Sequence, residues 1–328
     1  MNHEPAIRTE GLTKHYGDVK ALVDLDLEVK LGEVFGFLGP NGAGKTTMIR
    51  TILDLIHPTA GKAFILGLDS HEDAVEIRNH IGYLPSDLSM YPNLTGRDMI
   101  TYFSNLRGGV DWKYVGALAE RLQADLGKKV GDLSSGNRQK VGLILTFMNR
   151  PSVLIMDEPS TGLDPLMQRE FQAMMREVAE EGRAVFLSSH TLSEVQRVAD
   201  RVGIIRTGHL VDVEYVDDLR SKAIRTVELQ FDRPVERSVF EAVPGVRDVE
   251  VASHHATMSF DGQMDTLLRT ATEHYTLVDV TTQEADLEEI FLEYYRDGAR
   301  LGDPPQTPRD GVREGDPPQT PRDDGAGV

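Results

Sequence analysis

The chain has 328 residues and contains no cysteine. It therefore has no disulfide framework and no thiolate metal site, which fits a cytosolic protein. No apolar run approaches the roughly 18 residues that a membrane span needs, and the first residues contain no apolar signal region. We therefore expect a soluble chain that acquires any membrane role through a partner.

Positive charge is also scarce. The chain has 35 Lys and Arg against 53 Asp and Glu, a net charge of −18. This balance argues against binding nucleic acid through bulk electrostatics, although it leaves room for a local basic patch. We expect no nucleic-acid partner. The length suits about two domains with cores of their own.

What the chain does contain is a glycine-rich loop at residues 39–47, GPNGAGKTT. An apolar run, Val34–Leu38, precedes it and a helical pattern follows it, so the loop stands between a strand and a helix, where a GxxxxGK[ST] match predicts a phosphate site. Glycines let backbone N–H groups converge on oxygens, and the following helix adds its positive end. Lys45 can reach the β- and γ-phosphates, and the Thr46 hydroxyl can ligate Mg²⁺.

A glycine turn before an ordinary helix is the simpler interpretation of this loop. At average composition such a match arises by chance in roughly 1% of chains of this length, and the strand-loop-helix context makes chance a weaker explanation. We expect a nucleotide to contact Gly39, Asn41, Gly42, Ala43, Gly44, Lys45, Thr46 and Thr47.

Further polar residues follow two apolar runs. The run Val153–Met156 ends in Asp157 and Glu158, a pattern typical of a buried parallel strand with carboxylates at its carboxyl end, where α/β sheets bind ligands. A second strand, residues 184–187, is followed by His190. A lone histidine is more often structural, but beside a phosphate site a functional role is favoured.

The remaining patterns organise the chain. We expect strands over residues 6–38, with Tyr16 in a loop, a helical insert over about 85–135, and a closing hairpin at 202–213. A polar boundary at 217–222 precedes the order βαββαβ, including a helix from Val235 to Val243, which suggests a small ferredoxin-like α+β domain.

The end of the sequence has a different composition. Residues 287–295 have the spacing of an acidic amphipathic helix. The segment 302–310 recurs unchanged at 315–323 and is rich in proline and charge. It cannot bury enough apolar surface to order, so we expect a disordered proline-rich tail over 299–328.

Taken in order, the motifs resemble those of the ATP-binding cassette (ABC) ATPases over about residues 6–215, and several motifs together are far more specific than one. The phosphate loop resembles Walker A, residues 153–158 resemble Walker B, and residues 133–137 resemble the signature motif. Residues 160–164 resemble the D-loop, His190 the switch histidine, and Tyr16 the aromatic residue that stacks on adenine. The form of the signature and the C-terminal domain are similar to ATPase subunits of bacterial drug and antibiotic exporters.

Two departures from the family pattern stand out. The signature is LSSGN instead of LSGGQ, but Ser134 and Gly136, which approach the γ-phosphate in the family, are retained. Ser86 stands where many members carry a glutamine that helps to hold Mg²⁺. We take Ser86 as a metal-site candidate, acting through a metal-bound water.

The resemblance implies an ABC cassette at residues 1–222, with a mixed core sheet, an antiparallel β subdomain and a helical subdomain, and an α+β accessory domain at 223–298. It implies a homodimer that clamps ATP and Mg²⁺ between the phosphate loop of one copy and the signature loop of the other, with Ser134 and Gly136. Asp164 of the D-loop is also implied to bind the nucleotide. Thr46 and Asp157 would hold Mg²⁺, Glu158 would act as the base, and His190 would contact the γ-phosphate.

The implied function is ATP hydrolysis that powers export of a drug, antibiotic or lipid-like compound through a separate transmembrane subunit, at the cytoplasmic face of the membrane. Three alternatives remain open: an importer ATPase with the same motifs, a soluble ABC ATPase of translation or DNA repair, and a nucleotide-binding regulator without turnover. A single Walker A and the lack of sustained heptads disfavour the second, and the Asp157-Glu158 pair disfavours the third.

Overall fold

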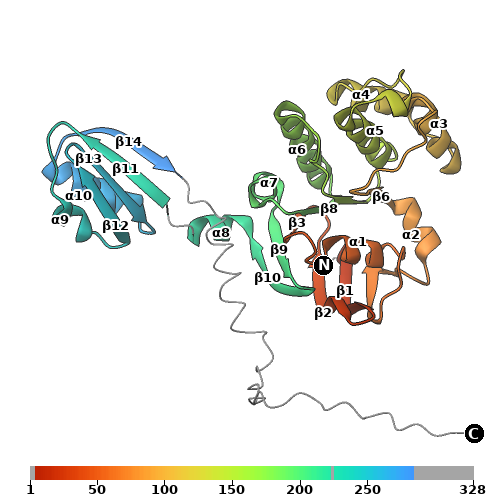
Figure 1. The fold of residues 1–328 in the computed structure, drawn as a ribbon, viewed down its shortest axis with the longest axis horizontal. Coiled ribbons are helices and arrows are strands. Elements are labelled where there is room, and N and C mark those ends of the chain that lie inside the picture. The colour runs from red at the N-terminus through yellow and green to blue at the C-terminus, as the bar shows by residue number, and fades with distance from the viewer. Residues whose placement is uncertain (1–3, 223–224, 284–328) are drawn as a thin grey trace, which may run out of the picture.

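The computed structural model describes residues 4–222 and 225–283. Its largest sheet has six strands in the order β10-β9-β3-β8-β7-β6 (Figure 1). Every neighbouring pair is parallel except the antiparallel pair β9–β10. The strands are β3 (Val34–Leu38), β6 (Ile81–Leu84), β7 (Val153–Asp157), β8 (Ala184–Ser189), β9 (Arg201–Arg206) and β10 (His209–Tyr215).

Both faces of this sheet are covered. On one face Val34, Leu154 and Val185 share a buried cluster with helices α5 (Ser135–Phe147), α6 (Pro165–Glu180) and α7 (Leu192–Val198). Their chain neighbours Phe35, Ile155 and Phe186 pack on the opposite face, against α1 (Lys45–Ile52) and a second sheet. Successive strand residues point to opposite faces, so a sheet buried on both faces needs the continuous apolar runs seen in the sequence.

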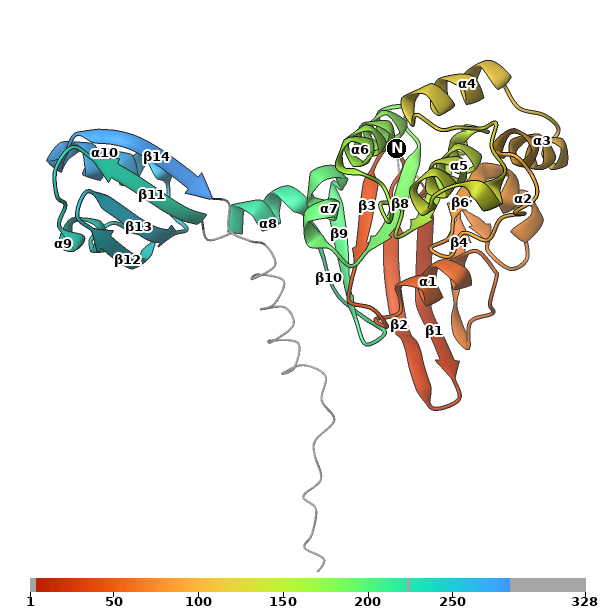
Figure 2. The ribbon, with the colours of Figure 1, turned by 45° about the horizontal axis from the view of Figure 1, so that its top comes forward.

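The second sheet is antiparallel, with the order β2-β1-β4-β5, and extends beside α1 (Figure 2). Its strands are β1 (Ile7–Tyr16), β2 (Val19–Val29), β4 (Ala60–Ile65) and β5 (Leu68–Asp69), and α2 (Ala74–His80) follows them. The predicted loop position of Tyr16 is wrong, because Tyr16 pairs with Val19 as the last residue of β1.

The predicted helical insert contains α3 (Gly96–Leu106), α4 (Trp112–Arg121) and a short 3₁₀ turn at Val130–Asp132. Helix α3 begins at a capping box, in which Thr95 and Asp98 each accept a backbone N–H of the other. In α4 and at its end, Val115, Leu118 and Leu122 stand at helical spacing and are buried. None of the described helices is long and apolar enough to cross a membrane.

The described part of the C-terminal region has the predicted βαββαβ order. Its strands form an antiparallel sheet β12-β13-β11-β14, which is the ferredoxin-like arrangement. The elements are β11 (Arg225–Phe231), α9 (Arg237–Glu241), β12 (Val246–Ala252), β13 (His255–Phe260), α10 (Met264–His274) and β14 (Leu277–Gln283). Helix α9 is shorter than the predicted 235–243. The limits of the domains stay a prediction.

The polar boundary predicted at 217–222 is a helix, α8 (Val216–Lys222). Val216 and Leu219 stand three residues apart, and both belong to the buried cluster that contains residues of α6 and α7. This one-turn apolar spacing, with two acids in the first turn, favours a helix. The predicted helix at 287–295 and the tail at 299–328 lie outside the described residues.

Candidate functional site: a phosphate loop facing two acids

Three parallel strands bring the candidate residues to one edge of the six-stranded sheet. The phosphate loop follows β3, Asp157 ends β7, and Ser189 ends β8. Parallel neighbours end on the same side of a sheet, and ligands of α/β folds bind there. The strand order β3-β8-β7 therefore sets the loop opposite the acids, with β8 between them.

The loop needs its glycines for conformation and for packing. Gly42 and Gly44 have φ angles of 81° and 115°, where other residues are strained. A Cβ on Gly44 would lie 2.5 Å from the Ala21 carbonyl oxygen, and one on Gly39 would lie 2.5 Å from the Ile205 carbonyl oxygen. The loop is thus fixed against β2 and β9, and it delivers the chain into the N-terminal end of α1, where helical N–H groups lack helical acceptors.

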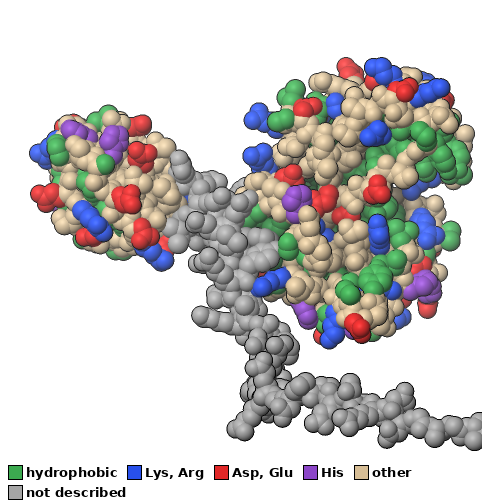
Figure 3. Space-filling model, viewed as in Figure 1, with side chains coloured by type: hydrophobic (Ala, Val, Ile, Leu, Met, Phe, Trp, Pro, Cys, Tyr) green, Lys and Arg blue, Asp and Glu red, His purple; other side chains and the backbone are tan. Residues whose placement is uncertain are grey.

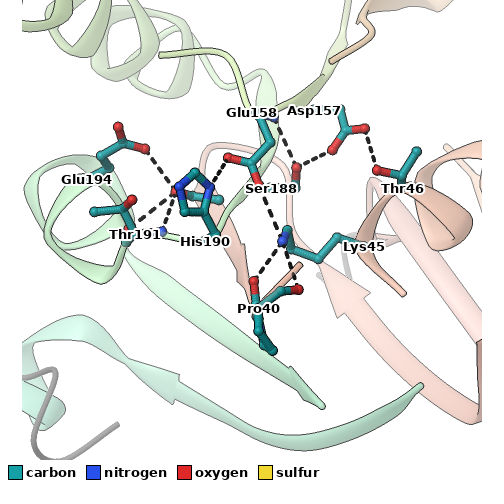
Figure 4. A network of polar contacts seen from close by, with 11 residues as sticks. Pro40, Lys45, Thr46, Asp157, Glu158, Ser188, His190, Thr191 and Glu194 are labelled. Carbon is teal, nitrogen blue, oxygen red and sulfur yellow. Dashed lines mark hydrogen bonds and ion pairs between the residues drawn. The ribbon is translucent and has the colours of Figure 1, made fainter. Parts of the chain in front are cut away.

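The Lys45 ammonium lies beside Glu158. Lys45 is only 6% exposed, and its Nζ donates to the Gly39 oxygen at 2.6 Å and the Pro40 oxygen at 3.2 Å (Figure 4). It also lies 3.3 Å from Oε1 of Glu158. A buried charge is tolerated only with such partners, and an anionic phosphate is a partner of the same kind.

Asp157 is fully buried and holds two hydroxyl groups. Its Oδ2 accepts from Thr46 Oγ1 at 2.8 Å, and its Oδ1 accepts from Ser188 Oγ at 2.5 Å. The sequence analysis anticipated Thr46 and Asp157 but missed Ser188. The signal for Ser188 is its place in β8, where it stands beside Asp157 in the parallel register.

Glu158 lies between the cation and the histidine. Its Oε2 is 2.7 Å from Nδ1 of His190, and its backbone N–H donates to Ser188 Oγ at 3.1 Å. Glu158 has a left-handed φ of 52°, a conformation that costs free energy and concentrates at functional sites. Figure 4 shows its side chain pointing back over the phosphate loop between His190 and Lys45.

Of these residues, Lys45, Thr46 and Glu158 border a cavity of about 560 Å³. Its wall contains much of the phosphate loop together with Ser86 and Glu158, and also Val19, Lys20, Ala21 and Thr207, which the sequence analysis missed. Tyr16 pairs with Val19 and is 49% exposed, so it stands next to this wall. Val19, Lys20 and Ala21 are the first residues of β2, and Thr207 lies in the turn between β9 and β10. Sequence spacing does not reveal that these segments approach each other.

The predicted site residues Ser134, Gly136 and Asp164 do not line this cavity. Tyr16, Gly39, Ala43, Asp157 and His190 do not line it either, but each of these five adjoins or contacts a residue of its wall. Ser134 caps α5 by accepting the Asn137 N–H at 3.3 Å, and Asp164 caps α6. A Cβ on Gly136 would lie 2.6 Å from the Gly162 oxygen. The signature loop and the D-loop are therefore packed on each other, outside the cavity.

The site fits a magnesium nucleotide. Backbone curvature without Cβ atoms and a nearly buried ammonium suit the phosphates. The Thr46 hydroxyl and the Asp157 carboxylate, 2.8 Å apart, are the hard oxygen ligands that Mg²⁺ prefers. With an acid and a histidine beside them, the arrangement suits phosphoryl transfer to water.

Sequence comparison connects this geometry to known proteins. A family model described as ABC transporter matches residues 22–161. The bacitracin transport ATP-binding protein BcrA of Bacillus licheniformis is 33% identical over 299 residues, which cover 89% of this chain and 98% of BcrA. The chain belongs to the ABC transporter family. The predicted family is thereby confirmed.

A second relative matches a smaller share of the chain. The probable multidrug ABC transporter ATP-binding protein YbhF of Escherichia coli (strain K12) is 35% identical over 225 residues, or 67% of this chain. The matched part is 39% of YbhF, so the chain spans about two fifths of the length of that relative.

Solved structures support the cassette fold. A structure described as the ATP-binding subunit of an ABC transporter has a TM-score of 0.61 at 28% identity, covering 66% of this chain and 92% of its own. A bacterial Atm1-family ABC exporter with ATP bound has a TM-score of 0.60 at 26% identity, covering 67% of this chain and 40% of its own. The mixed core sheet, antiparallel sheet and helical part predicted for an ABC cassette are confirmed.

Proposed function

We propose that this chain hydrolyses ATP to power an exporter of a drug, antibiotic or lipid-like compound, working through a separate membrane subunit. One observation carries the proposal. A single edge of the sheet brings a phosphate loop, a Thr46–Asp157 pair and Glu158 together around one cavity. The substrate class rests on the relatives, which are named for bacitracin transport and for multidrug transport. The direction rests on the structural similarity to a bacterial Atm1-family ABC exporter.

In this proposal the phosphate loop and Lys45 bind the phosphates of ATP, while Tyr16 stacks on the adenine. Thr46 and Asp157 would hold Mg²⁺, and Ser86, in the cavity wall, would hold it through a water molecule. The ion neutralises charge on the phosphate oxygens and orients them. Ser188 keeps one oxygen of Asp157 occupied, which leaves the oxygen on the Thr46 side for the metal.

Glu158 acts on the attacking water. Its carboxylate accepts a proton as the water oxygen bonds to the γ-phosphorus and the bond to the ADP oxygen breaks. His190, 2.7 Å from Glu158, orients that carboxylate and contacts the γ-phosphate. Lys45 lies within reach of both Glu158 and the bound phosphates, so it neutralises charge where it develops.

A second copy of the chain completes the site. Ser134, Gly136 and Asp164 do not line the cavity of their own chain, and they belong to two loops packed on each other. In a two-fold dimer these loops of one copy cover the phosphate loop of the other. Two ATP molecules are then clamped between two chains, and hydrolysis releases the clamp.

An apolar groove in the helical part supplies a surface for the membrane subunit. The groove has a volume of about 270 Å³ and lies between β6 and α3, with Leu88, Met99 and Phe103 in its wall. Leu106 is 67% exposed nearby, and apolar side chains gather over the outer side of α3 (Figure 3). Exposed apolar patches of this kind mark interaction sites. Pro85, beside Ser86, also lines the groove, which joins this surface to the ATP site.

The location follows from the same proposal. A chain that hydrolyses ATP to power a membrane subunit works at the cytoplasmic face of the membrane. Residues 223–298 then serve as an assembly or regulatory module. In the described part, 225–283, no three His, Asp or Glu side chains lie close enough together to hold a metal ion. The sequence of this part has no second phosphate loop.

The test is reconstitution. The full chain is purified with the membrane protein that accompanies it, and both are placed in vesicles with ATP supplied outside. Accumulation of bacitracin or a lipophilic dye inside, dependent on ATP and lost in Glu158→Gln, supports export. ATP-driven release of preloaded compound supports the importer alternative.

The partner surface is tested separately. Leu106→Asp should lose the membrane protein on purification, because it places a charge on the apolar patch of α3. Val75→Asp is the matched control, since Val75 is also strongly exposed (76%) but lies on α2. Equal capture by both variants would contradict docking at α3.

A further inference from the structure

Three potential metal ligands lie together outside the ATP site. Asp54 follows α1, His57 stands in the loop before β4, and His71 lies in the turn between β5 and α2. The Nδ1 atoms of both histidines lie 3.1 Å from the same oxygen, Oδ1 of Asp54. The two rings meet edge to face, with centroids 4.9 Å apart. Two separate segments of the chain thus converge on one carboxylate oxygen.

The backbone holds these side chains in place. Asp54 is in the left-handed region (φ 52°), and its N–H donates to the Thr51 oxygen at 3.1 Å. The turn with His71 is fixed by Asp69, whose Oδ1 accepts the N–H groups of His71 at 3.0 Å and Glu72 at 3.3 Å. Those backbone hydrogen bonds also lower the pKa of the Asp69 carboxyl. His71 therefore faces Asp54 from a turn that has its own anchors.

The spacing suits a tetrahedral ion. Zinc binds imidazole nitrogen and carboxylate oxygen at about 2.0–2.2 Å, and two ligands of a regular tetrahedron of that size are about 3.3 Å apart. The two nitrogen–oxygen distances of 3.1 Å are close to that value, and all three ligand atoms lie within 4.8 Å of one another. Both histidines are about two-thirds exposed, at 71% and 67%, which leaves room for a water as the fourth ligand.

The local charge favours a cation. Asp54, Asp69 and Glu72 border the same cavity, which has a volume of about 320 Å³. Lys62 is also in its wall, but its Nζ is paired with Oδ2 of Asp69 at 3.3 Å. Three carboxylates thus outnumber one ammonium. Imidazole ligands select zinc and related transition metals, whereas Mg²⁺ requires oxygen ligands.

We propose that Asp54, His57 and His71 form a binding site for a divalent transition-metal ion of the zinc class, distinct from the magnesium of the ATP site. Neutral imidazoles coordinate through Nδ1, and Asp54 contributes one oxygen. The ion links the segment that leaves the phosphate-loop helix to the turn between β5 and α2. A ligand that binds only the folded state stabilises it, so the ion raises the midpoint of thermal unfolding.

The competing explanation is a metal-free hydrogen-bonded cluster, in which both imidazoles donate to Asp54. Calorimetric titration of ZnCl₂ into the untagged, chelator-treated full chain separates the two explanations. The metal site predicts one tight Zn²⁺ per chain. His57→Gln, His71→Gln and Asp54→Asn should each weaken it by at least about tenfold, the scale on which metal sites respond to altered ligation. His80→Gln, which removes an exposed histidine of α2, is the control and should change nothing.

A second readout reports geometry. Co²⁺ in a four-coordinate site absorbs visible light much more strongly than octahedral Co²⁺, and this band should appear at one equivalent and vanish in His71→Gln. Titration that leaves the affinity equal in wild type, His57→Gln and His71→Gln would overturn the site and indicate adventitious binding to surface histidines. Neither experiment uses ATP, so its failure would leave the proposed ATPase untouched.

Discussion

Lys45 Nζ lies 3.3 Å from Glu158 Oε1, so the cation of the phosphate loop reaches the acid that follows β7. The two side chains are 6% and 16% exposed, and such a shielded pair interacts more strongly than a surface pair. Bound phosphates and Glu158 compete for the same ammonium. In our proposal this relationship joins phosphate binding to the availability of the base.

The first prediction concerns that ammonium. Lys45→Ala should weaken ATP binding by about 10–100-fold, because a hydrogen bond from a charged group contributes about 1.5–3 kcal/mol. A direct titration of magnesium ATP measures it. Lys128→Ala is the control, since Lys128 is 66% exposed and does not line the cavity. Equal affinity in both variants would remove Lys45 from the phosphate site.

The second prediction tests the two-chain site. Lys45→Ala destroys one chain's phosphate loop, and Ser134→Arg blocks its signature loop. A mixture of the two variants should regain hydrolysis, because each heterodimer retains one site with both parts intact. A mixture no more active than either variant would mean either that the two chains do not pair in trans, or that hydrolysis at one site requires an intact second site. Analytical ultracentrifugation of Glu158→Gln with magnesium ATP decides between these, since it detects the dimer directly.

The third prediction concerns Ser188, which the sequence analysis missed. Ser188→Ala should lower the free energy of unfolding by about 1–3 kcal/mol, because it leaves a buried oxygen of Asp157 without its donor. It should also reduce kcat more than ATP affinity, since Ser188 Oγ accepts the Glu158 N–H as well. Urea unfolding and steady-state kinetics measure the two effects. Ser188→Thr, which keeps the hydroxyl, should restore most of both; failure of that rescue would indicate a packing role.

A fourth prediction concerns the contact of α4 with α6. Arg121 donates to Glu177 at 2.6 and 2.8 Å and to Glu170 at 2.6 Å. The hydrogen bonds from Arg121 lower the pKa of the Glu177 carboxyl. A lowered folded-state pKa stabilises the fold above the unfolded pKa and loses that effect as pH falls through the folded value.

Glu177→Gln should therefore cost about 0.5–1 kcal/mol at pH 7, a value kept small because the pair is exposed. The cost should fade as the pH drops below about 4, where the unfolded carboxyl is protonated. Urea titrations at several pH values measure it. Glu180→Gln, on the exposed side of the same helix, should show no such trend.

The sequence predicted the elements that depend on local patterns. The phosphate loop stands between β3 and α1, and the βαββαβ order appears in the C-terminal sheet. Each has a short-range physical cause: glycine conformation or alternation of apolar residues. The assignment of residues to roles at the ATP site stays a prediction.

What the sequence did not predict depends on contacts between distant segments. Ser188 contacts Asp157 because β8 lies beside β7 in the sheet. The sequence of neither strand indicates which strands are neighbours. Lys20 reaches the cavity from β2 and Thr207 from the β9–β10 turn, which belong to two different sheets. The charged residues of α8 predicted a polar boundary and not a helix. The burial of Val216 and Leu219 on one side stabilises the helix.

The central claim, hydrolysis with Glu158 as the base, is tested most directly by single-turnover hydrolysis of magnesium ATP in wild type and Glu158→Gln. The amide keeps the shape of the side chain but cannot accept the proton of the attacking water. The account predicts unchanged ATP affinity and hydrolysis slower by about 10²–10⁴-fold. Hydrolysis within a few-fold of wild type, at saturating ATP, would contradict it.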